Sequence, residues 1–81
     1  MDESIVEVKW IDASVITDNL PLGAEIKPLE RLSVGYLLHR DDDYIELTFG
    51  FIKNFHNSEM ACEMKVALPM AMVKSIRFVD D

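Results

Sequence analysis

Residues whose types could do chemistry are few in this sequence, and the densest group is the run Asp41, Asp42 and Asp43. A calcium-binding loop needs oxygen ligands at alternating positions, a glycine at its sixth position and a distant glutamate. The stretch DDDYIELTFGF lacks that glycine, and adjacent side chains of an extended chain point in opposite directions. Aspartate instead favours turns, because its carboxylate accepts hydrogen bonds from nearby backbone amides. The three aspartates therefore predict the turn of a hairpin.

The two histidines and the single cysteine are the remaining candidates for a metal site or a nucleophile. Neither His39 nor His56 has a histidine or cysteine partner at the short spacing of zinc sites. Cys62 stands in an apolar stretch, where a lone cysteine is more often a small core residue. The sequence also lacks a glycine-rich phosphate loop, a nucleophile elbow and a paired-carboxylate signature. We expect no catalytic residues, no metal and no cofactor, and so a protein that is not an enzyme.

A local excess of basic residues is the one feature that favours contact with phosphate. Between residues 53 and 77 the chain has four basic and two acidic residues, although its overall formal charge is −7. Clustered lysine and arginine supply the electrostatic part of nucleic-acid binding, and exposed aromatic rings can stack on bases. RNA or single-stranded DNA is therefore a candidate partner, with candidate contact residues Tyr44, Lys53, Lys65, Lys74 and Arg77.

The length of 81 residues predicts one domain over residues 1–81. A domain this short buries only about 60% of its unfolded surface. One cysteine excludes an intrachain disulfide, so partner subunits are the remaining common support, and we expect a homo-oligomer. The apolar runs are far shorter than the ~20 residues that span a membrane, and the acidic start lacks the basic region of a signal peptide. We expect a cytoplasmic protein with no membrane partner.

Alternation of apolar and polar residues predicts five β-strands, over residues 4–12, 31–40, 44–54, 61–69 and 74–79. Gly35, inside the second strand, predicts a bend or a close contact between backbones. The third strand alternates most clearly. The apolar side chains expected to face the core from the first, third and fifth strands are Val6, Val8, Trp10, Ile45, Leu47, Phe49, Phe51, Ile76 and Phe78.

Proline and glycine mark the connections between the strands. Pro21, Gly23 and Pro28 argue against a continuous helix or strand, and predict a long loop over residues 13–30 with one helical turn over residues 22–26. Pro69 ends the fourth strand because it has no amide proton for the ladder, and residues 70–73 are about one helical turn long. Five short strands with these connections predict a small closed barrel, since closure removes exposed sheet edges.

Three segments together resemble a group of small phage and metagenomic proteins of uncharacterised function: VEVKWIDA, LSVGYLLHRDDDYIEL and VALPMAMVKSIRFV. The similarity extends along most of the chain, in the order strand, long loop, strand with a VG pair, DD turn and closing strand with KSI. It implies an all-β, five-stranded Sm-like barrel of the kind shared by Sm, Hfq and Src-homology-type domains. Sm-like barrels form rings by pairing the fourth strand of one subunit with the fifth strand of the next, and such rings bind RNA.

The Sm motifs can be compared residue by residue. The first has the form G-x-L-x-x-x-D-x-x-apolar-N, and Gly35, Leu37, Asp41 and Tyr44 fit it, whereas Ile45 stands where the RNA-binding asparagine would be. The second has an I-R-G core, and residues 68–70 are Leu, Pro and Met, so the base-clamping arginine and glycine are missing. The resemblance implies the fold and a structural turn at Asp41, but not the usual uridine pocket.

Two functions follow as expectations. The first is a phage-derived RNA- or DNA-binding ring in the cytoplasm of a host cell. The alternative is a protein–protein interaction or structural adaptor module without nucleic-acid binding. Four methionines between residues 60 and 72 suit either a core or an adaptable partner surface. Pairing through the fourth and fifth strands would place the subunit interface on Met64, Val66, Leu68, Met70, Met72 and Ile76.

Overall fold

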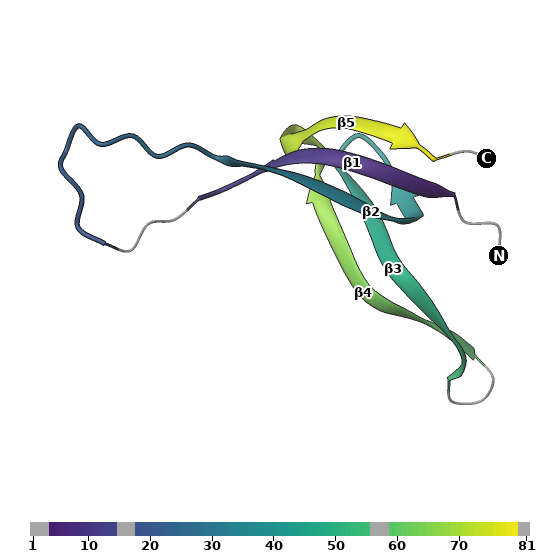
Figure 1. The fold of residues 1–81 in the computed structure, drawn as a ribbon. Coiled ribbons are helices and arrows are strands. Elements are labelled where there is room, and N and C mark those ends of the chain that lie inside the picture. Colours follow the sequence, from purple (N-terminus) through teal and green to yellow (C-terminus); the bar gives the residue numbers. More distant parts are fainter. Residues whose placement is uncertain (1–3, 15–17, 56–58, 80–81) are drawn as a thin grey trace.

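Five antiparallel strands form one sheet in the computed structural model, which describes residues 4–14, 18–55 and 59–79 (Figure 1). Their order in the sheet is β4-β3-β2-β1-β5. The predicted all-β class is confirmed. The elements are β1 (Ile5–Asp12), β2 (Leu29–Arg40), β3 (Tyr44–Phe55), β4 (Glu59–Pro69), the 3-10 helix η1 (Met70–Met72) and β5 (Val73–Phe78).

The observed bounds agree with the predicted strands to within two residues, and the helical turn predicted over residues 70–73 is η1. The helical turn predicted over residues 22–26 is wrong. That segment contains one hydrogen-bonded turn, in which the Ala24 amide donates to the Pro21 carbonyl oxygen over 2.9 Å. Its residues are all exposed, and a helix of a few residues is not stable without packing.

The buried core is built by three strands. Val6 and Val8 of β1, Ile45 and Leu47 of β3 and Leu68 of β4 have almost no exposed surface. The alternation predicted for β1 and for the first half of β3 is confirmed, because side chains two residues apart enter the same core. Partly buried side chains from β1, β2, β4, β5 and η1 pack around it: Trp10, Leu37, Val66, Met70, Val73 and Ile76.

β3 loses its alternation at Thr48. This residue is buried beside Leu47, and its hydroxyl oxygen lies 2.6 Å from the carbonyl oxygen of Glu63 on β4. Gly35 of β2 lies against the same place, since a Cβ atom there would stand 2.7 Å from the Thr48 carbonyl oxygen. The close backbone contact predicted at Gly35 is therefore confirmed.

Two aromatic side chains expected to face the core, Phe49 and Phe78, are exposed, and these predictions are wrong. Phe49 follows Thr48, beyond which β3 continues away from the core (Figure 1). Phe78 ends β5, the last strand of the sheet. The alternation fixes which side chains share a face, whereas the path of the strand decides whether anything covers that face.

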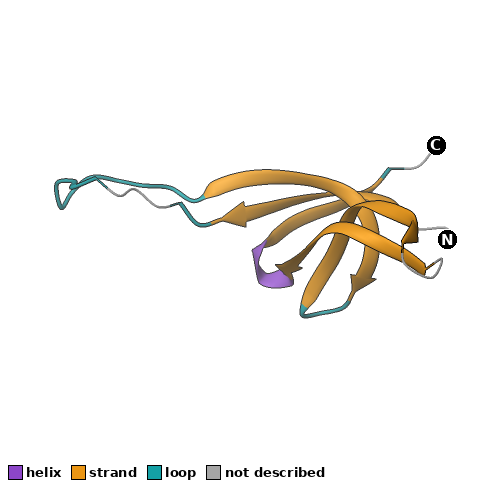
Figure 2. Cartoon of the chain, turned by 90° about the horizontal axis from the view of Figure 1, so that it is seen from below, coloured by secondary structure: helices purple, strands orange, loops and turns teal. Residues whose placement is uncertain are grey.

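The sheet is open among the described residues, because β4 and β5 are its two edge strands and no pairing joins them (Figure 2). β2 pairs with β3 only over residues 36–40, whereas it pairs with β1 over residues 29–36. β3 and β4 continue past Thr48 as a two-stranded hairpin. The predicted closed barrel is therefore not formed by hydrogen bonds within the described part of this chain.

Two arms leave the body of the sheet in different directions (Figure 1). We call residues 18–28, beyond the ends of β1 and β2, the loop arm. The hairpin arm is residues 49–55 of β3 with residues 59–64 of β4. The radius of gyration is consequently 16.7 Å and the extents are 56 × 28 × 24 Å. A compact domain of this length has a radius of gyration of about 12 Å.

Candidate interaction surfaces

The aspartate run forms the turn between β2 and β3, as predicted. Asp41 Oδ1 accepts hydrogen bonds from the amides of Asp43 (2.7 Å) and Tyr44 (3.0 Å), and the Asp41 amide donates to the Tyr44 carbonyl oxygen (3.1 Å). His39 Nε2 lies 2.6 Å from Asp41 Oδ2. The hydrogen bond from His39, and then those from Tyr44 and Asp43, lower the pKa of the Asp41 carboxyl to about 2. Both carboxylate oxygens are therefore used to hold the turn.

The histidine and cysteine candidates stand apart from one another. His39 belongs to the turn and its ring stacks on Tyr44, with centroids 4.7 Å apart. Cys62 is half-buried and free on β4, and His56 lies outside the described residues. Over residues 4–14, 18–55 and 59–79, no three side chains of the metal-binding types come together.

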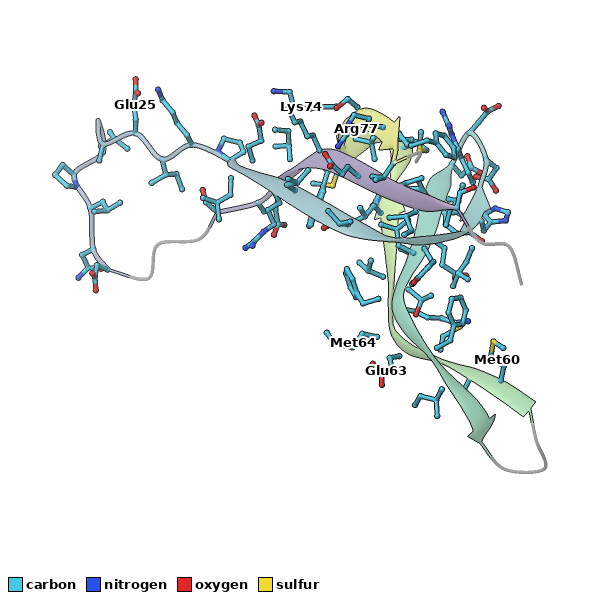
Figure 3. All side chains as sticks on the ribbon, turned by 45° about the vertical axis from the view of Figure 1, so that its right-hand side comes forward. Glu25, Met60, Glu63, Met64, Lys74 and Arg77 are labelled. Carbon is cyan, nitrogen blue, oxygen red and sulfur yellow. The ribbon has the colours of Figure 1, made fainter. Side chains whose placement is uncertain are left out.

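The candidate nucleic-acid residues are divided between the two edges of the sheet. Lys74 and Arg77 lie on β5 (Figure 3), where Lys74 Nζ stands 3.0 Å from Glu30 Oε2 and Arg77 pairs with Glu7. The hydrogen bond from Lys74 lowers the pKa of Glu30.

The other candidates for nucleic-acid contact lie elsewhere. Lys65 is exposed on β4, at the opposite edge of the sheet, and Tyr44 lies at the β2–β3 turn. The side chain of Lys53 lies outside what the structure describes. The basic residues predicted to act together thus form no shared patch among the described side chains, and the two on β5 are already paired with carboxylates.

Most of the predicted interface residues contribute to the core of their own chain. Leu68 is 2% exposed, and Val66, Met70 and Ile76 pack against the buried cluster. Met72 of η1 is half-buried. The fully buried position of Leu68 leaves its side chain no free surface for a partner. The exception is Met64, whose side chain is 76% exposed.

The loop arm carries three large apolar side chains that are open to solvent. Leu20, Leu22 and Ile26 are exposed, and Leu22 is as open as in an extended peptide. They sit in an irregular segment with two prolines, so no periodic pattern marked them as a surface. The sequence did offer one signal, which is the length of the loop predicted over residues 13–30. Loops of this length without secondary structure are uncommon and are often functional.

The hairpin arm is the second exposed apolar region. Phe49, Ile52, Met60 and Met64 are all exposed on it. Met64 has a φ angle of 46°, which lies in the left-handed region that few side chains adopt. It projects from the hairpin into open space (Figure 3). Phe49 and Met64 lie across from one another, between the paired positions that flank them on β3 and β4.

An open hollow of about 540 Å³ lies at the root of the loop arm. Two polar contacts hold its walls: Trp10 Nε1 donates to Ser33 Oγ over 2.9 Å, and Arg31 Nε stands 2.7 Å from Asp12 Oδ2. The polar groups in these two contacts are therefore satisfied by one another. Its lining residues are Trp10, Asp12, Glu30, Arg31, Leu32 and Ser33.

Comparison with known proteins gives this chain no relative: no protein-family model, no curated protein and no solved structure matches it. In the described part of the chain, no helix has the length and apolar character needed to cross a membrane.

Proposed function

We propose that this protein is a structural assembly module that associates with further copies of itself through exposed apolar surface. The observation that carries the proposal is that the chain buries few large apolar side chains and exposes many. Five apolar side chains are buried among the described residues, whereas both arms carry large apolar side chains in contact with solvent.

The total exposed area of the chain also supports a protein partner. The chain exposes 6383 Å², whereas a compact monomer of 9.3 kDa exposes roughly 5,000 Å². The excess of about 1,400 Å² is of the order of the surface that one copy contributes to one or two standard interfaces, about 800 Å² each. A large exposed apolar surface on a small soluble chain marks an interaction site.

The strand order also supports the finer proposal that the fold is an Sm-like or Src-homology-type barrel in an open form. The sheet runs β4-β3-β2-β1-β5, and η1 stands between β4 and β5. This order leaves the edges of β4 and β5 free, and an unpaired edge is a template for pairing with another chain. Pairing of β4 with β5 of a neighbour remains our alternative route to a ring.

Sedimentation velocity of the purified protein over a hundredfold range of concentration tests the proposal. We expect a sedimentation coefficient that rises with concentration to a value above that of a 9.3 kDa monomer. The midpoint of thermal unfolding should rise with concentration as well, because association stabilises the folded state by mass action. A monomer at every concentration, with a constant midpoint, would remove self-assembly as the function.

A nucleic-acid-binding ring is the second candidate. The observation that favours it is the exposed Tyr44 ring, stacked on His39 beside Arg40, because an exposed aromatic ring can stack on a base. The pairing of Lys74 and Arg77 with glutamates weighs against it. Fluorescence anisotropy with short single-stranded RNA and DNA tests it. Saturable binding that weakens with salt, and that is lost in Tyr44→Ala, would support the ring, whereas no binding at low salt would exclude it.

A further inference from the structure

We infer that the loop arm of one copy docks on the hairpin arm of a second copy, so that the subunits join head to tail. The inference rests on the proposed self-assembly and names the two surfaces that meet. Each copy therefore contacts two other copies, one through its loop arm and the other through its hairpin arm.

The loop arm cannot be covered by its own sheet. It extends beyond the ends of β1 and β2, and the hairpin arm leaves the body in another direction (Figure 1). Within the described residues, one hydrogen bond ties it to the rest of the chain at its root, from Ser14 Oγ to the Lys27 carbonyl oxygen. Leu20 and Ile26 are about half exposed and Leu22 is fully exposed, so the arm has apolar surface free for another molecule.

The hairpin arm offers what an irregular apolar segment needs. It has exposed apolar side chains at Phe49 and Met64, and it has open hydrogen-bonding edges. β4 is an edge strand along its whole length, and β3 beyond Thr48 pairs with β4 alone. A two-stranded hairpin is marginal in water without further packing. An extended segment that adds its backbone to such an edge satisfies the amides of both partners.

The exposed area of the whole chain is sufficient for two such contacts. It exceeds that of a compact monomer by about 1,400 Å², which is of the order of the surface that one copy contributes to two standard interfaces, about 800 Å² each. Packing of two loop arms against each other would instead leave the hairpin arm uncovered. Because donor and acceptor surfaces differ, the contact is heterologous, and repetition of it gives a ring or a filament rather than a closed dimer.

Two variants test the inference, and in each of them substitutions disrupt the apolar surface of one arm. The loop variant carries Leu22→Ser and Ile26→Ser, in a segment whose residues are all exposed. The hairpin variant carries Ile52→Thr and Met64→Asn. Threonine retains β-propensity, and asparagine tolerates the left-handed conformation found at Met64. Val34→Thr is the matched control, because Val34 is exposed on β2 outside both arms.

The measurement is sedimentation velocity of each variant alone and of an equimolar mixture in which one variant carries a fluorescent label. We expect the native chain and Val34→Thr to form species larger than a dimer. Each variant alone should associate at least tenfold more weakly. The mixture should give a discrete one-to-one dimer, because the intact loop arm of one variant meets the intact hairpin arm of the other and no further copy can add.

Three outcomes would overturn the inference while leaving self-assembly in place. The first is a hairpin variant that dimerises alone as strongly as the native chain associates, which would indicate contact between loop arms. The second is a mixture that stays monomeric. The third is assembly of both variants as in the native chain, which would transfer the contact to the edges of β4 and β5. A native chain that is monomeric at all concentrations would instead remove the proposed function itself. Circular dichroism of each variant confirms that it is folded.

Discussion

The body of the sheet and its two arms are built from the same strands, yet they differ in what holds them. In the body, Val8 of β1 and Leu47 of β3 are buried in one core. A few residues further along β3, beyond Thr48, Phe49 and Ile52 are exposed. The sequence of β3 is apolar through both halves, so its composition does not explain the difference.

The two halves of β3 differ in the number of strands that pair with them. The first half of β3 has β2 on one side and β4 on the other, whereas the second half has β4 alone. A side chain gains roughly 25 cal/mol for each Å² of apolar surface it buries, so the same residue type stabilises the body and contributes little to an arm. A two-stranded hairpin of this kind is marginal in water without further packing.

The largest expected effect contrasts two leucines. Leu47→Ala should lower the free energy of unfolding by about 2–5 kcal/mol, because the side chain is buried and leaves a cavity. Leu22→Ala should change it by less than about 0.5 kcal/mol at the lowest workable protein concentration, because the side chain is fully exposed. Equilibrium denaturation of both variants checks this. Equal losses would mean that the loop arm packs within its own chain.

A smaller effect is expected from two glycines. Gly35→Ala should cost about 1–3 kcal/mol, because its Cβ would stand 2.7 Å from a backbone oxygen of Thr48 that cannot move without shifting β3. Gly23→Ala is the matched control, since nothing lies within 4 Å of its Cβ in the loop arm. Thermal unfolding followed by circular dichroism compares them. A Gly35→Ala protein as stable as the native chain would contradict the close crossing of β2 and β3.

The joint between body and hairpin arm depends on Thr48. Its hydroxyl oxygen lies 2.6 Å from the Glu63 carbonyl oxygen and 2.9 Å from that of Gly50, and its single proton can be donated to one of them at a time. Thr48→Val should cost about 1–2 kcal/mol, since it leaves a part-buried carbonyl without its donor. Compared with the native chain, amide hydrogen exchange should then accelerate more in residues 50–52 than in residues 45–47. Thr48→Ser retains the hydroxyl and is expected to exchange like the native chain at both places.

The smallest effect is a pH dependence at the β2–β3 turn. The folded pKa of Asp41, about 2, lies below its usual value of 3.8. The ionised carboxylate therefore contributes stability that is complete above about pH 4 and is lost as the pH falls toward 2. In Asp41→Asn this part of the acid dependence should disappear, while the amide oxygen can still accept from the backbone. Denaturation midpoints between pH 2 and pH 5 provide the comparison. An identical acid dependence in both proteins would mean that another group titrates.

The chemistry of residues close in sequence determined much of the local structure of this protein. The alternation in IVEVKWID, the aspartate run and Pro69 predicted strand, turn and strand end at the positions where the structure has them. Gly35 predicted a close approach of backbones, and Gly35 does lie against Thr48. Each of these depends on a residue and its nearest neighbours in the chain, so a sequence is sufficient to find it.

Tertiary structure decided the rest. The sequence grouped Lys65, Lys74 and Arg77 because they are close in number, but sheet order places β4 and β5 at opposite edges, and glutamates from β1 and β2 pair with the β5 cations. Likewise, the alternation could not show that β3 leaves the core at Thr48. Burial depends on how many strands surround a position, and that number is a property of the assembled sheet rather than of any segment of the sequence.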